Sequence, residues 1–477
     1  MRYNVLTEPW IPARLPDGSI REYGVLELLE HAHELVEITD AMPNYEYGMY
    51  RFLFVFLMDA FHPKRQRDIR ILLERGSFDM DVIRSYVEEC NRDGERFDLF
   101  DEKHPFFQQA EGWDGKEELK SPANLNPAMP SGNNHVHFDH TLESDSVMEI
   151  REAAKALCGI NLFSTAGVQG YPSTPSGAPP VYTIVRGDNL FQTLVYGMMP
   201  SNLYSNYDSP APVWRSGVSV KPKEKVSSTS LLYGLLFPCR RVQLVPGETG
   251  GIIGIRYEQG MNYENYDAWA DPYVTYYVGK NGRQNLKPNM DKENWRNLGT
   301  ILNKEEGAPQ VVTEAAGCDM APVLNLITYS AVTNQMNYLD LQRGSYSVPV
   351  RFVEDKILYG FMCALLESVE NSGSSLSKSI YALQKSMGMT EGAAAAEKTR
   401  TLGRYYFACR LAFFGALERL AENQAELEPF QDEWNERIRG IRWEEYNRFV
   451  DRMGGDSRFL LESERIKAQN IRKEGKK

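Results

Sequence analysis

Hydrophobic residues in the first 345 positions occur in short runs of differing period. Residues 45–60 are apolar on nearly every side, which predicts a helix buried inside a large domain. The β-branched and aromatic run 181–186 predicts a strand, and shorter runs at 242–245, 252–257 and 273–278 predict antiparallel sheet. This part of the chain is therefore expected to form one large, irregular mixed α/β domain.

After Pro349 the pattern changes to long, almost proline-free segments with apolar residues at helical spacing. A break in the helical pattern is expected at Asn371-Ser372-Gly373. The predicted helices are residues 350–371, 376–387, 393–423, 428–453 and 457–473. The expected fold class is thus α+β, with a mixed α/β domain over residues 1–348 and an antiparallel helical (four-helix) bundle over residues 349–477.

Four polar stretches rich in small residues interrupt the first domain, at residues 131–140, 164–178, 279–282 and 333–337. Strands on both sides of the turn at 281–282 would form a hairpin with Lys280 at its tip. Each stretch taken alone is typical of an ordinary surface connection. A functional role for them depends on further evidence.

Charge and length narrow the classes of function. The 477 residues carry a formal net charge of −12, which argues against a self-sufficient nucleic-acid-binding protein but leaves room for a local basic groove. One such place is a predicted helix that contains Lys64, Arg65, Arg67, Arg70 and Arg75. A solvated basic face is the simpler interpretation of this helix, and a surface that faces phosphates is the alternative.

The six cysteines are scattered and form no C-x-x-C pair, which is typical of buried thiols in a reducing compartment. No run approaches the roughly 18 apolar residues that a membrane-spanning helix needs, and the first residues lack the apolar core of a signal peptide. A cytoplasmic protein without a membrane segment is expected.

One motif points to metal chemistry. His135, His137, Asp139 and His140 match the H-x-H-x-D-H string of metallo-β-lactamase-like zinc hydrolases, in which such residues surround one or two zinc ions. Further histidine ligands would be needed downstream, but the chain contains no histidine after His140. The zinc hydrolase is therefore kept only as the alternative function. No nucleophile elbow or phosphate-binding loop indicates another enzyme.

Several short motifs follow one another in an order that resembles the CasA family, the large subunit of the type I-E CRISPR surveillance complex Cascade. Each motif is weak alone, but together they span nearly the whole first domain. They are Asn4-Val-Leu-Thr-Glu-Pro-Trp10-Ile-Pro12, His104-Pro105-Phe106-Phe107-Gln108, Ser131-Gly132-Asn133-Asn134, Val185-Arg186-Gly187, Pro212-Val213-Trp214, Gly234-Leu235-Leu236-Phe237 and Asn334-Gln335.

The resemblance implies a protein without catalytic residues of its own, and no cofactor is expected. Such a subunit recognises the short motif (PAM) beside the target in double-stranded DNA and helps to open the duplex for guide-RNA pairing. Its implied partners are the other Cascade subunits, the 5′ handle of the guide RNA, the target DNA and the helicase–nuclease that it helps to recruit. Relatives often carry a four-cysteine zinc site, but Cys158 and Cys239 each lack a nearby second cysteine, so no zinc is expected.

The resemblance also implies two groups of contact residues. The loop that anchors the subunit near the guide-RNA handle corresponds to Asn134, Phe138 and Asp139. The DNA contacts are a glycine loop along the minor groove, a lysine finger and a glutamine wedge, and these correspond to Gly167, Val168, Gln169 and Gly170, to Lys280, and to Asn334, Gln335 and Met336. Of the family's glycine loop only Gly167 and Gly170 are kept, so the preferred DNA motif stays open.

Overall fold

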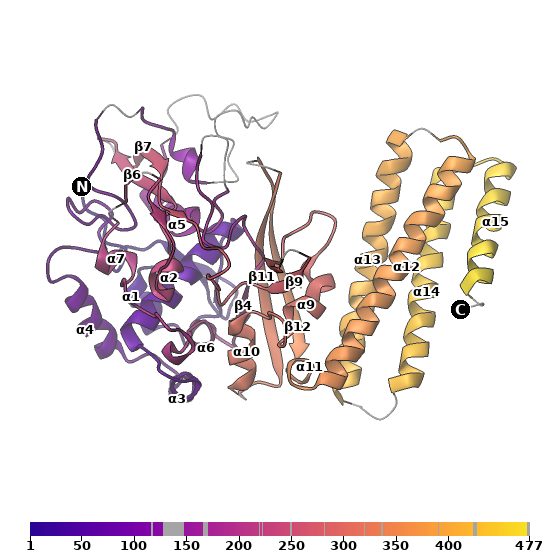
Figure 1. Cartoon of the computed structure of the whole chain (residues 1–477), viewed down its shortest axis with the longest axis horizontal. Coiled ribbons are helices and arrows are strands. Elements are labelled where there is room, and N and C mark those ends of the chain that lie inside the picture. Colours follow the sequence, from indigo (N-terminus) through magenta and orange to yellow (C-terminus); the bar gives the residue numbers. More distant parts are fainter. Residues whose placement is uncertain are drawn as a thin grey trace. The chain divides into compact units, whose positions relative to one another are not determined.

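The computed structural model contains two compact units, which are described separately (Figure 1). One unit consists of Met1–Asn294 and Asn303–Tyr346, and the other of Trp295–Leu302 and Ser347–Lys477. The structure describes residues 1–115, 118–126, 147–165, 170–218, 220–221, 223–248, 250–280, 282–318, 320–334, 337–389, 391–422 and 427–474. Residues 295–302 precede the predicted domain boundary in sequence but lie in the second unit.

The first unit combines short helices with small sheets, as predicted. Its helices are α1 (Val25–Glu30), α2 (Pro43–Phe61), α3 (Gln66–Arg75), α4 (Met80–Cys90), α5 (Ile150–Ile160), α6 (Leu190–Tyr196), α7 (Val213–Ser216), α8 (Leu231–Gly234) and α10 (Gln310–Gly317), with the 3₁₀ helices η1 (Pro122–Leu125) and η2 (Ser201–Leu203). Its strands are β1 (Ile11–Arg14), β2 (Ile20–Tyr23), β3 (Glu37–Ile38), β4 (Tyr182–Arg186), β5 (Lys225–Val226), β6 (Arg240–Pro246), β7 (Ile252–Gln259), β8 (Asn262–Tyr263), β9 (Tyr276–Gly279), β10 (Gly282–Asn285), β11 (Val323–Asn334) and β12 (Asn337–Pro349).

The sheets each contain two or three strands. Their orders, among the described residues, are β2-β1-β3, β12-β11-β4, β6-β7, β9-β10 and β5-β8. Strands β5 and β8 pair in parallel. The pairs β1–β2, β1–β3, β9–β10, β4–β11 and β6–β7 are antiparallel. The predicted strands near 181–186, 242–245 and 252–257 are confirmed as β4, β6 and β7.

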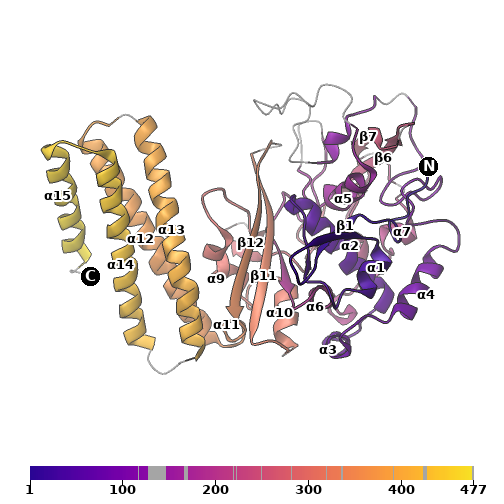
Figure 2. The same cartoon turned by 180° about the vertical axis from the view of Figure 1, so that it is seen from behind.

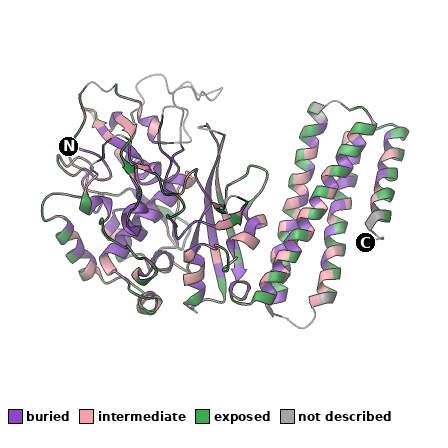
Figure 3. Ribbon diagram, viewed as in Figure 1, coloured by how far each residue is buried: buried purple, intermediate pink, exposed green. Residues whose placement is uncertain are grey.

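Helix α2 forms the core of the first unit. Every residue from Asn44 to Asp59 is buried, which confirms the helix predicted over 45–60 and explains why it is apolar on all sides (Figure 3). Phe52 packs edge-on against Phe106 and Trp214 at ring-centroid distances of 5.2 and 5.6 Å. Each fully buried aromatic ring of this kind contributes roughly 1.5–3 kcal/mol to stability.

Helices α2 and α5 cross at a pair of glycines. A Cβ atom on Gly48 would lie 2.7 Å from the backbone nitrogen of Gly159, and a Cβ atom on Gly159 would lie 2.7 Å from the carbonyl oxygen of Asn44. Real carbon atoms do not approach backbone atoms so closely, so only glycine permits this crossing. The crossing fixes α5, and with it the chain that follows α5 toward residue 165.

The long strands β11 and β12 were not predicted. A polar surface connection is expected at residues 333–337, but Thr333 and Asn334 end β11, and β12 begins at Asn337. Strand β11 pairs antiparallel with β4, with Asn325 opposite Arg186. The run Val323–Thr333 is rich in β-branched and apolar residues, which is the signal of a buried strand that sequence analysis passed over.

The second unit is a helical bundle, as predicted. It contains η3 (Asn294–Asn297), whose first residue belongs to the first unit, with α9 (Leu298–Ile301), α11 (Arg351–Glu354), α12 (Lys356–Ser386), α13 (Glu391–Glu422), α14 (Leu427–Met453) and α15 (Ser457–Glu474). Helices α12–α15 lie side by side in both views (Figure 1, Figure 2). Of the helices among the described residues, none is long and apolar enough to cross a membrane.

The predicted break at Asn371-Ser372-Gly373 is wrong, because α12 runs through it without interruption. The backbone of α12 comes close to α13 at this point, where a Cβ atom on Gly373 would lie 2.4 Å from the hydroxyl of Tyr406 and 3.0 Å from the ring of Tyr405. The small residues therefore serve helix packing and do not end the helix. The helix begins instead at Asp355, whose carboxylate accepts hydrogen bonds from the backbone N–H groups of Ile357 and Leu358.

Candidate nucleic-acid interface

Three of the predicted DNA-contact residues lie within the described part of the chain. Gly170, Lys280 and Asn334 are all exposed. Several other predicted positions lie outside the described residues: Gly167, Val168, Gln169, Gln335, Met336, the anchoring residues Asn134, Phe138 and Asp139, and the motif residues His135, His137 and His140. The surroundings of these segments are nevertheless defined by the residues that flank them.

The side chain of Arg240 forms hydrogen bonds with the backbone on both sides of segment 166–169. Arg240, at the start of β6, is 5 % exposed and donates hydrogen bonds to the carbonyl oxygens of Thr165 at 2.8 Å and Pro172 at 2.5 Å. Its Nε donates to the hydroxyl of Tyr257 on β7 at 3.0 Å. The ring of Tyr171 lies 5.0 Å from the guanidinium carbon, a cation–π contact. A planar group with five donors satisfies several acceptors at once, which a lysine ammonium would not do in this geometry.

The start of β12 lies against the same flank. The hydroxyl of Tyr338 donates to the carbonyl oxygen of Phe163 at 2.5 Å. Burial raises the pKa of the Tyr338 hydroxyl, so the group stays protonated at neutral pH and remains a donor. Tyr338 lies two residues after the predicted wedge 334–336, and Phe163 precedes the predicted glycine loop. The structure thus brings the flanks of these two predicted segments together.

Lys280 lies between β9 and β10, as the hairpin prediction required. Gly279 pairs with Gly282 across the hairpin, and Gly282 adopts φ +91°, a value that favours glycine. The Lys280 ammonium makes no hydrogen bond or ion pair with any described residue. At the base of the hairpin, Asn285 donates to the carbonyl oxygen of Ser176 at 2.6 Å. The hairpin is therefore attached to the same stretch, 163–181, that carries the other two contacts.

Strand β7 holds both ends of the predicted anchoring segment. Lys120 exchanges two backbone hydrogen bonds with Ile255, each of 2.9 Å, and Met148 exchanges two with Ile252, of 2.9 and 2.8 Å. The chain therefore leaves β7 at residue 120 and returns to it at residue 148. The Lys120 ammonium also donates to the hydroxyl of Tyr171 at 3.0 Å, which links this segment to the flank that Arg240 holds.

Metal binding finds no support among the described residues, where no group of three or more His, Cys, Asp or Glu side chains could hold an ion. The histidine motif itself lies outside these residues, so the structure leaves the zinc alternative untested. Cys158 and Cys239 are buried, and burial raises the pKa of both thiols. A raised pKa disfavours the thiolate form that zinc binds.

Sequence reasoning missed the residues that hold the segments in place. Arg240 and Tyr338 act on carbonyl oxygens distant in sequence, and no local motif marks such contacts. Lys120 precedes the expected contact loop and carried no signal of its own. A sequence signal was present only for Tyr338. The run Val323–Thr333 marks β11, and recognising β11 would have drawn attention to the strand that follows it, in which Tyr338 is the second residue.

Comparison with known proteins agrees with the resemblance found in the sequence. A family model described as CRISPR-associated protein Cse1 matches residues 4–444. CRISPR-associated protein CasA/Cse1 of Thermus thermophilus is 29% identical over 371 residues, which cover 73% of this chain and 71% of that relative.

Solved structures share the fold over nearly the entire chain. Thermus thermophilus CasA gives a TM-score of 0.81 at 22% identity, and the match covers 100% of both chains. Thermobifida fusca Cse1 gives 0.79 at 18% identity, with 98% of this chain and 96% of that chain covered. A chain of a CRISPR RNA-guided surveillance complex gives 0.78 at 17% identity, with 98% and 99% covered. Together with the family model, these matches confirm the resemblance, and the chain belongs to the family of CRISPR-associated protein Cse1, also called CasA.

Proposed function

We propose that this chain is the large subunit of a type I-E Cascade complex and that it has no catalytic activity of its own. In this role it recognises the PAM in double-stranded target DNA, helps to open the duplex for guide-RNA pairing and helps to recruit the helicase–nuclease. Membership of the Cse1 family over residues 4–444 supports the role, as does the likeness to a chain of a CRISPR RNA-guided surveillance complex.

The observation that carries the proposal is the convergence of three predicted DNA-contact segments on one stretch of chain. Arg240 binds the flanks of segment 166–169, Tyr338 joins the start of β12 to Phe163, and Asn285 joins the β9–β10 hairpin to Ser176. Segments that merely connect surface elements have no reason to share hydrogen bonds in this way. Their convergence favours a single contact surface.

The chemistry of these residues suits the minor groove of DNA. That groove presents few distinguishing acceptors, so the Lys280 ammonium, which has no partner among the described residues, would distinguish few base pairs there. A side chain at position 335, inserted beneath the motif, would cost a few kcal/mol of base unstacking. Guide pairing replaces the lost DNA pairs and offsets that cost.

The guide-RNA handle is proposed to meet the segment between residues 120 and 148. Both ends of this segment are fixed on β7, through Ile255 and Ile252. The proposed handle contacts Asn134, Phe138 and Asp139 all belong to it.

Two substitutions test the DNA contacts in the complex assembled with guide RNA. Lys280→Ala and Gln335→Ala should each weaken binding of a duplex that carries the motif by about tenfold, close to 1.4 kcal/mol, because each removes one contact in the groove. Lys287→Ala is the matched control, since Lys287 is also an exposed lysine without a hydrogen bond or ion pair among the described residues. Unchanged binding by both test variants would favour a scaffold role without DNA contact.

Metal content tests the alternative zinc hydrolase that uses His135, His137, Asp139 and His140. The proposed function expects purified protein to hold no stoichiometric zinc in this motif. Zinc bound at one or more ions per chain in the wild type and lost in His137→Ala, measured by elemental analysis, would instead support the hydrolase.

A further inference from the structure

The basic helix α3 is not used by the proposed DNA contacts. In a chain with a net charge of −12, this helix and the two residues before it expose five cationic side chains: Lys64, Arg65, Arg67, Arg70 and Arg75. Both views place α3 at the end of the first unit opposite β6 and β7, which carry the Arg240 contacts (Figure 1, Figure 2). A duplex held near β6 and β7 would therefore leave α3 free for a different ligand.

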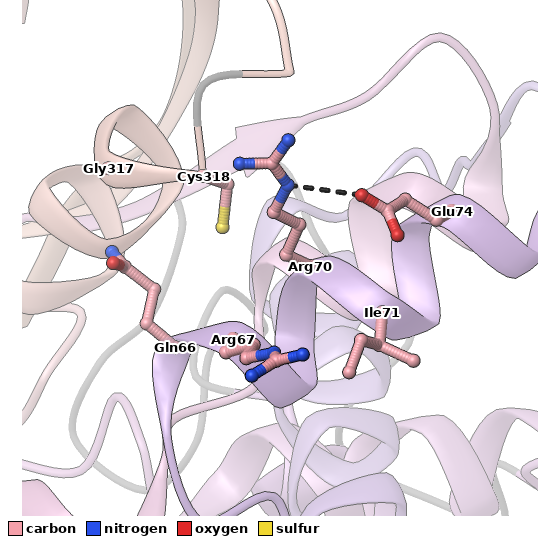
Figure 4. Close-up of a pocket in the computed structure, with 7 residues that line it drawn as sticks. All are labelled: Gln66, Arg67, Arg70, Ile71, Glu74, Gly317 and Cys318. Atoms are coloured by element: carbon pink, nitrogen blue, oxygen red, sulfur yellow. Dashed lines mark hydrogen bonds and ion pairs between the residues drawn. The ribbon is translucent and has the colours of Figure 1, made fainter.

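A groove of about 420 Å³ lies between α3 and the C-terminal end of α10, and we call it the α3 groove (Figure 4). Gln66 holds the two helices together by donating to the carbonyl oxygen of Glu314 at 3.1 Å. A Cβ atom on Gly317 would lie 2.3 Å from Gln66, so glycine permits this close approach. The groove is lined by Gln66, Arg67, Arg70, Ile71, Gly317 and Cys318, together with Glu74.

Two guanidinium groups in the α3 groove are available for an anionic ligand. Among the described residues, Arg70 is engaged only through Nε, which donates to Glu74 at 3.1 Å, so both of its terminal nitrogens keep their donors there. Arg67 makes no hydrogen bond or ion pair with any described residue. The planar guanidinium group of an arginine can donate two parallel hydrogen bonds to one carboxylate, so two such arginines suit a ligand that carries carboxylates.

The neighbouring carboxylates neutralise this pair only in part. Glu74 pairs with Arg70 through Nε alone, at 3.1 Å. Asp68 accepts hydrogen bonds from the backbone N–H groups of Lys64 and Arg65, at 2.8 and 3.0 Å, and so is turned to the start of the helix. On the α10 side, the carboxylate of Glu314 accepts a hydrogen bond from Gln310 at 2.8 Å. The positive end of the α3 dipole adds to the field near Arg67.

The form of the groove favours a peptide over a nucleic acid. Ile71 is 40 % exposed and offers an apolar contact, which a sugar–phosphate backbone does not need. The next helix, α4, follows with Asp79 and Asp81 exposed at its start, so no continuous basic track exists for a chain of phosphates. A short acidic segment with an apolar residue satisfies both the arginines and Ile71.

We infer that the α3 groove is a docking site for an acidic segment of a protein partner, in which Asp or Glu side chains pair with Arg67 and Arg70. The inference rests on the proposed function, because that function supplies the protein partners: the other subunits and the helicase–nuclease. It goes further by naming the surface and the chemistry of the segment that occupies it.

Site-specific photo-crosslinking in the assembled complex tests the inference. The photoreactive residue p-benzoylphenylalanine replaces Ile71 in the full chain, and the complex with its helicase–nuclease is irradiated and digested for peptide mapping. Crosslinks should map to a partner peptide rich in Asp and Glu. The same residue at position 20 is the control, because Ile20 is 59 % exposed on β2, away from the groove.

Charge variants show whether the arginines hold the segment. Arg67→Gln with Arg70→Gln should lower the crosslink yield by about tenfold, and Arg67→Lys with Arg70→Lys should restore part of it. The pair Arg92→Gln with Lys103→Gln removes the same charge from exposed positions elsewhere and should change nothing. Melting temperatures of all variants confirm that they fold.

Three results would overturn the inference: crosslinks to nucleic acid, crosslinks to a peptide without acidic residues, and no crosslink in a complex that has assembled. If the proposed function itself is wrong, a different result is expected: the chain would not co-elute with the other subunits and guide RNA during size-exclusion chromatography.

Discussion

At the scale of single residues, the interface depends on side chains that hold loops and not on the loop residues that drew attention in the sequence. Arg240 donates to four acceptors while almost completely buried, and two of them belong to the flanks of one segment. Lys280 and Gln335 are proposed as contact residues because a family resemblance names them. Arg240 was not foreseen, because the two carbonyl oxygens that it holds beside this segment lie more than 60 residues away in sequence.

Replacing Arg240 by lysine should loosen these flanks. A lysine keeps the charge but reaches fewer acceptors, and each buried carbonyl left without a donor costs roughly 1–3 kcal/mol. We expect the free energy of unfolding in urea to fall by about 2 kcal/mol or more and binding of the DNA motif by the complex to weaken. Arg256→Lys on β7 is the control, since Arg256 is only half-buried and should lose under 1 kcal/mol. Equal losses in the two variants would remove the special role of Arg240.

At the scale of elements, the sequence predicted α2, the basic helix α3, the long helices of the bundle and the β9–β10 hairpin but erred where tertiary packing overrides local preference. Asn371-Ser372-Gly373 has the composition of a helix end, yet α12 continues because Gly373 lets α12 approach Tyr405 and Tyr406. In the same way, strand β11 ends in polar residues that look like a loop, although the strand runs from Val323 to Asn334. Local composition at these two places does not reveal the packing that decides the structure.

Two glycines of α12 give a matched test of this packing. Gly373→Ala should lower the free energy of unfolding by about 1–3 kcal/mol, because its methyl group would overlap the rings of Tyr405 and Tyr406. Gly360→Ala should raise it by up to about 1 kcal/mol, because Gly360 has open space and alanine favours the helix. Both are measured by urea unfolding. Stabilisation by Gly373→Ala would indicate that α12 and α13 do not pack closely there.

At the scale of the whole molecule, the succession of an α/β region and a helical bundle followed from periodicity alone. Periodicity did not predict that residues 295–302 belong to the second unit, because this assignment depends on contacts distant in sequence. Arg296 forms a bidentate ion pair with Glu370 at 2.6 and 2.7 Å, and its guanidinium lies 3.4 Å from the ring centre of Tyr406. These contacts make residues 295–302 part of the second unit.

The six cysteines also act as reporters of the whole fold. Five are buried, and burial raises the pKa of every thiol, to about 11 for Cys90 and Cys318 and to about 12 for Cys409. Native protein at pH 8 should therefore react slowly with a thiol reagent such as dithionitrobenzoate, and unfolded protein should react at all six positions. Rapid reaction of several thiols in native protein would contradict the packing of both units.

The same shifts predict a dependence of stability on pH. Thiols whose pKa is raised by folding contribute stability that is complete below their unfolded pKa, near 9, and that is lost as the pH rises toward 11 or 12. Urea midpoints should therefore fall between pH 9 and 11. Replacing Cys90 and Cys318 by serine should reduce that fall, although the variants will be less stable at pH 7.

The central claim is that this chain gives the complex its recognition of the DNA motif, and omission of the chain tests it most directly. Cascade assembled with guide RNA is prepared with and without the chain, and binding is measured on matched duplexes that carry or lack the motif. We predict that the motif strengthens binding by at least tenfold when the chain is present and has no effect when it is absent. An equal preference for the motif in both preparations would contradict the account.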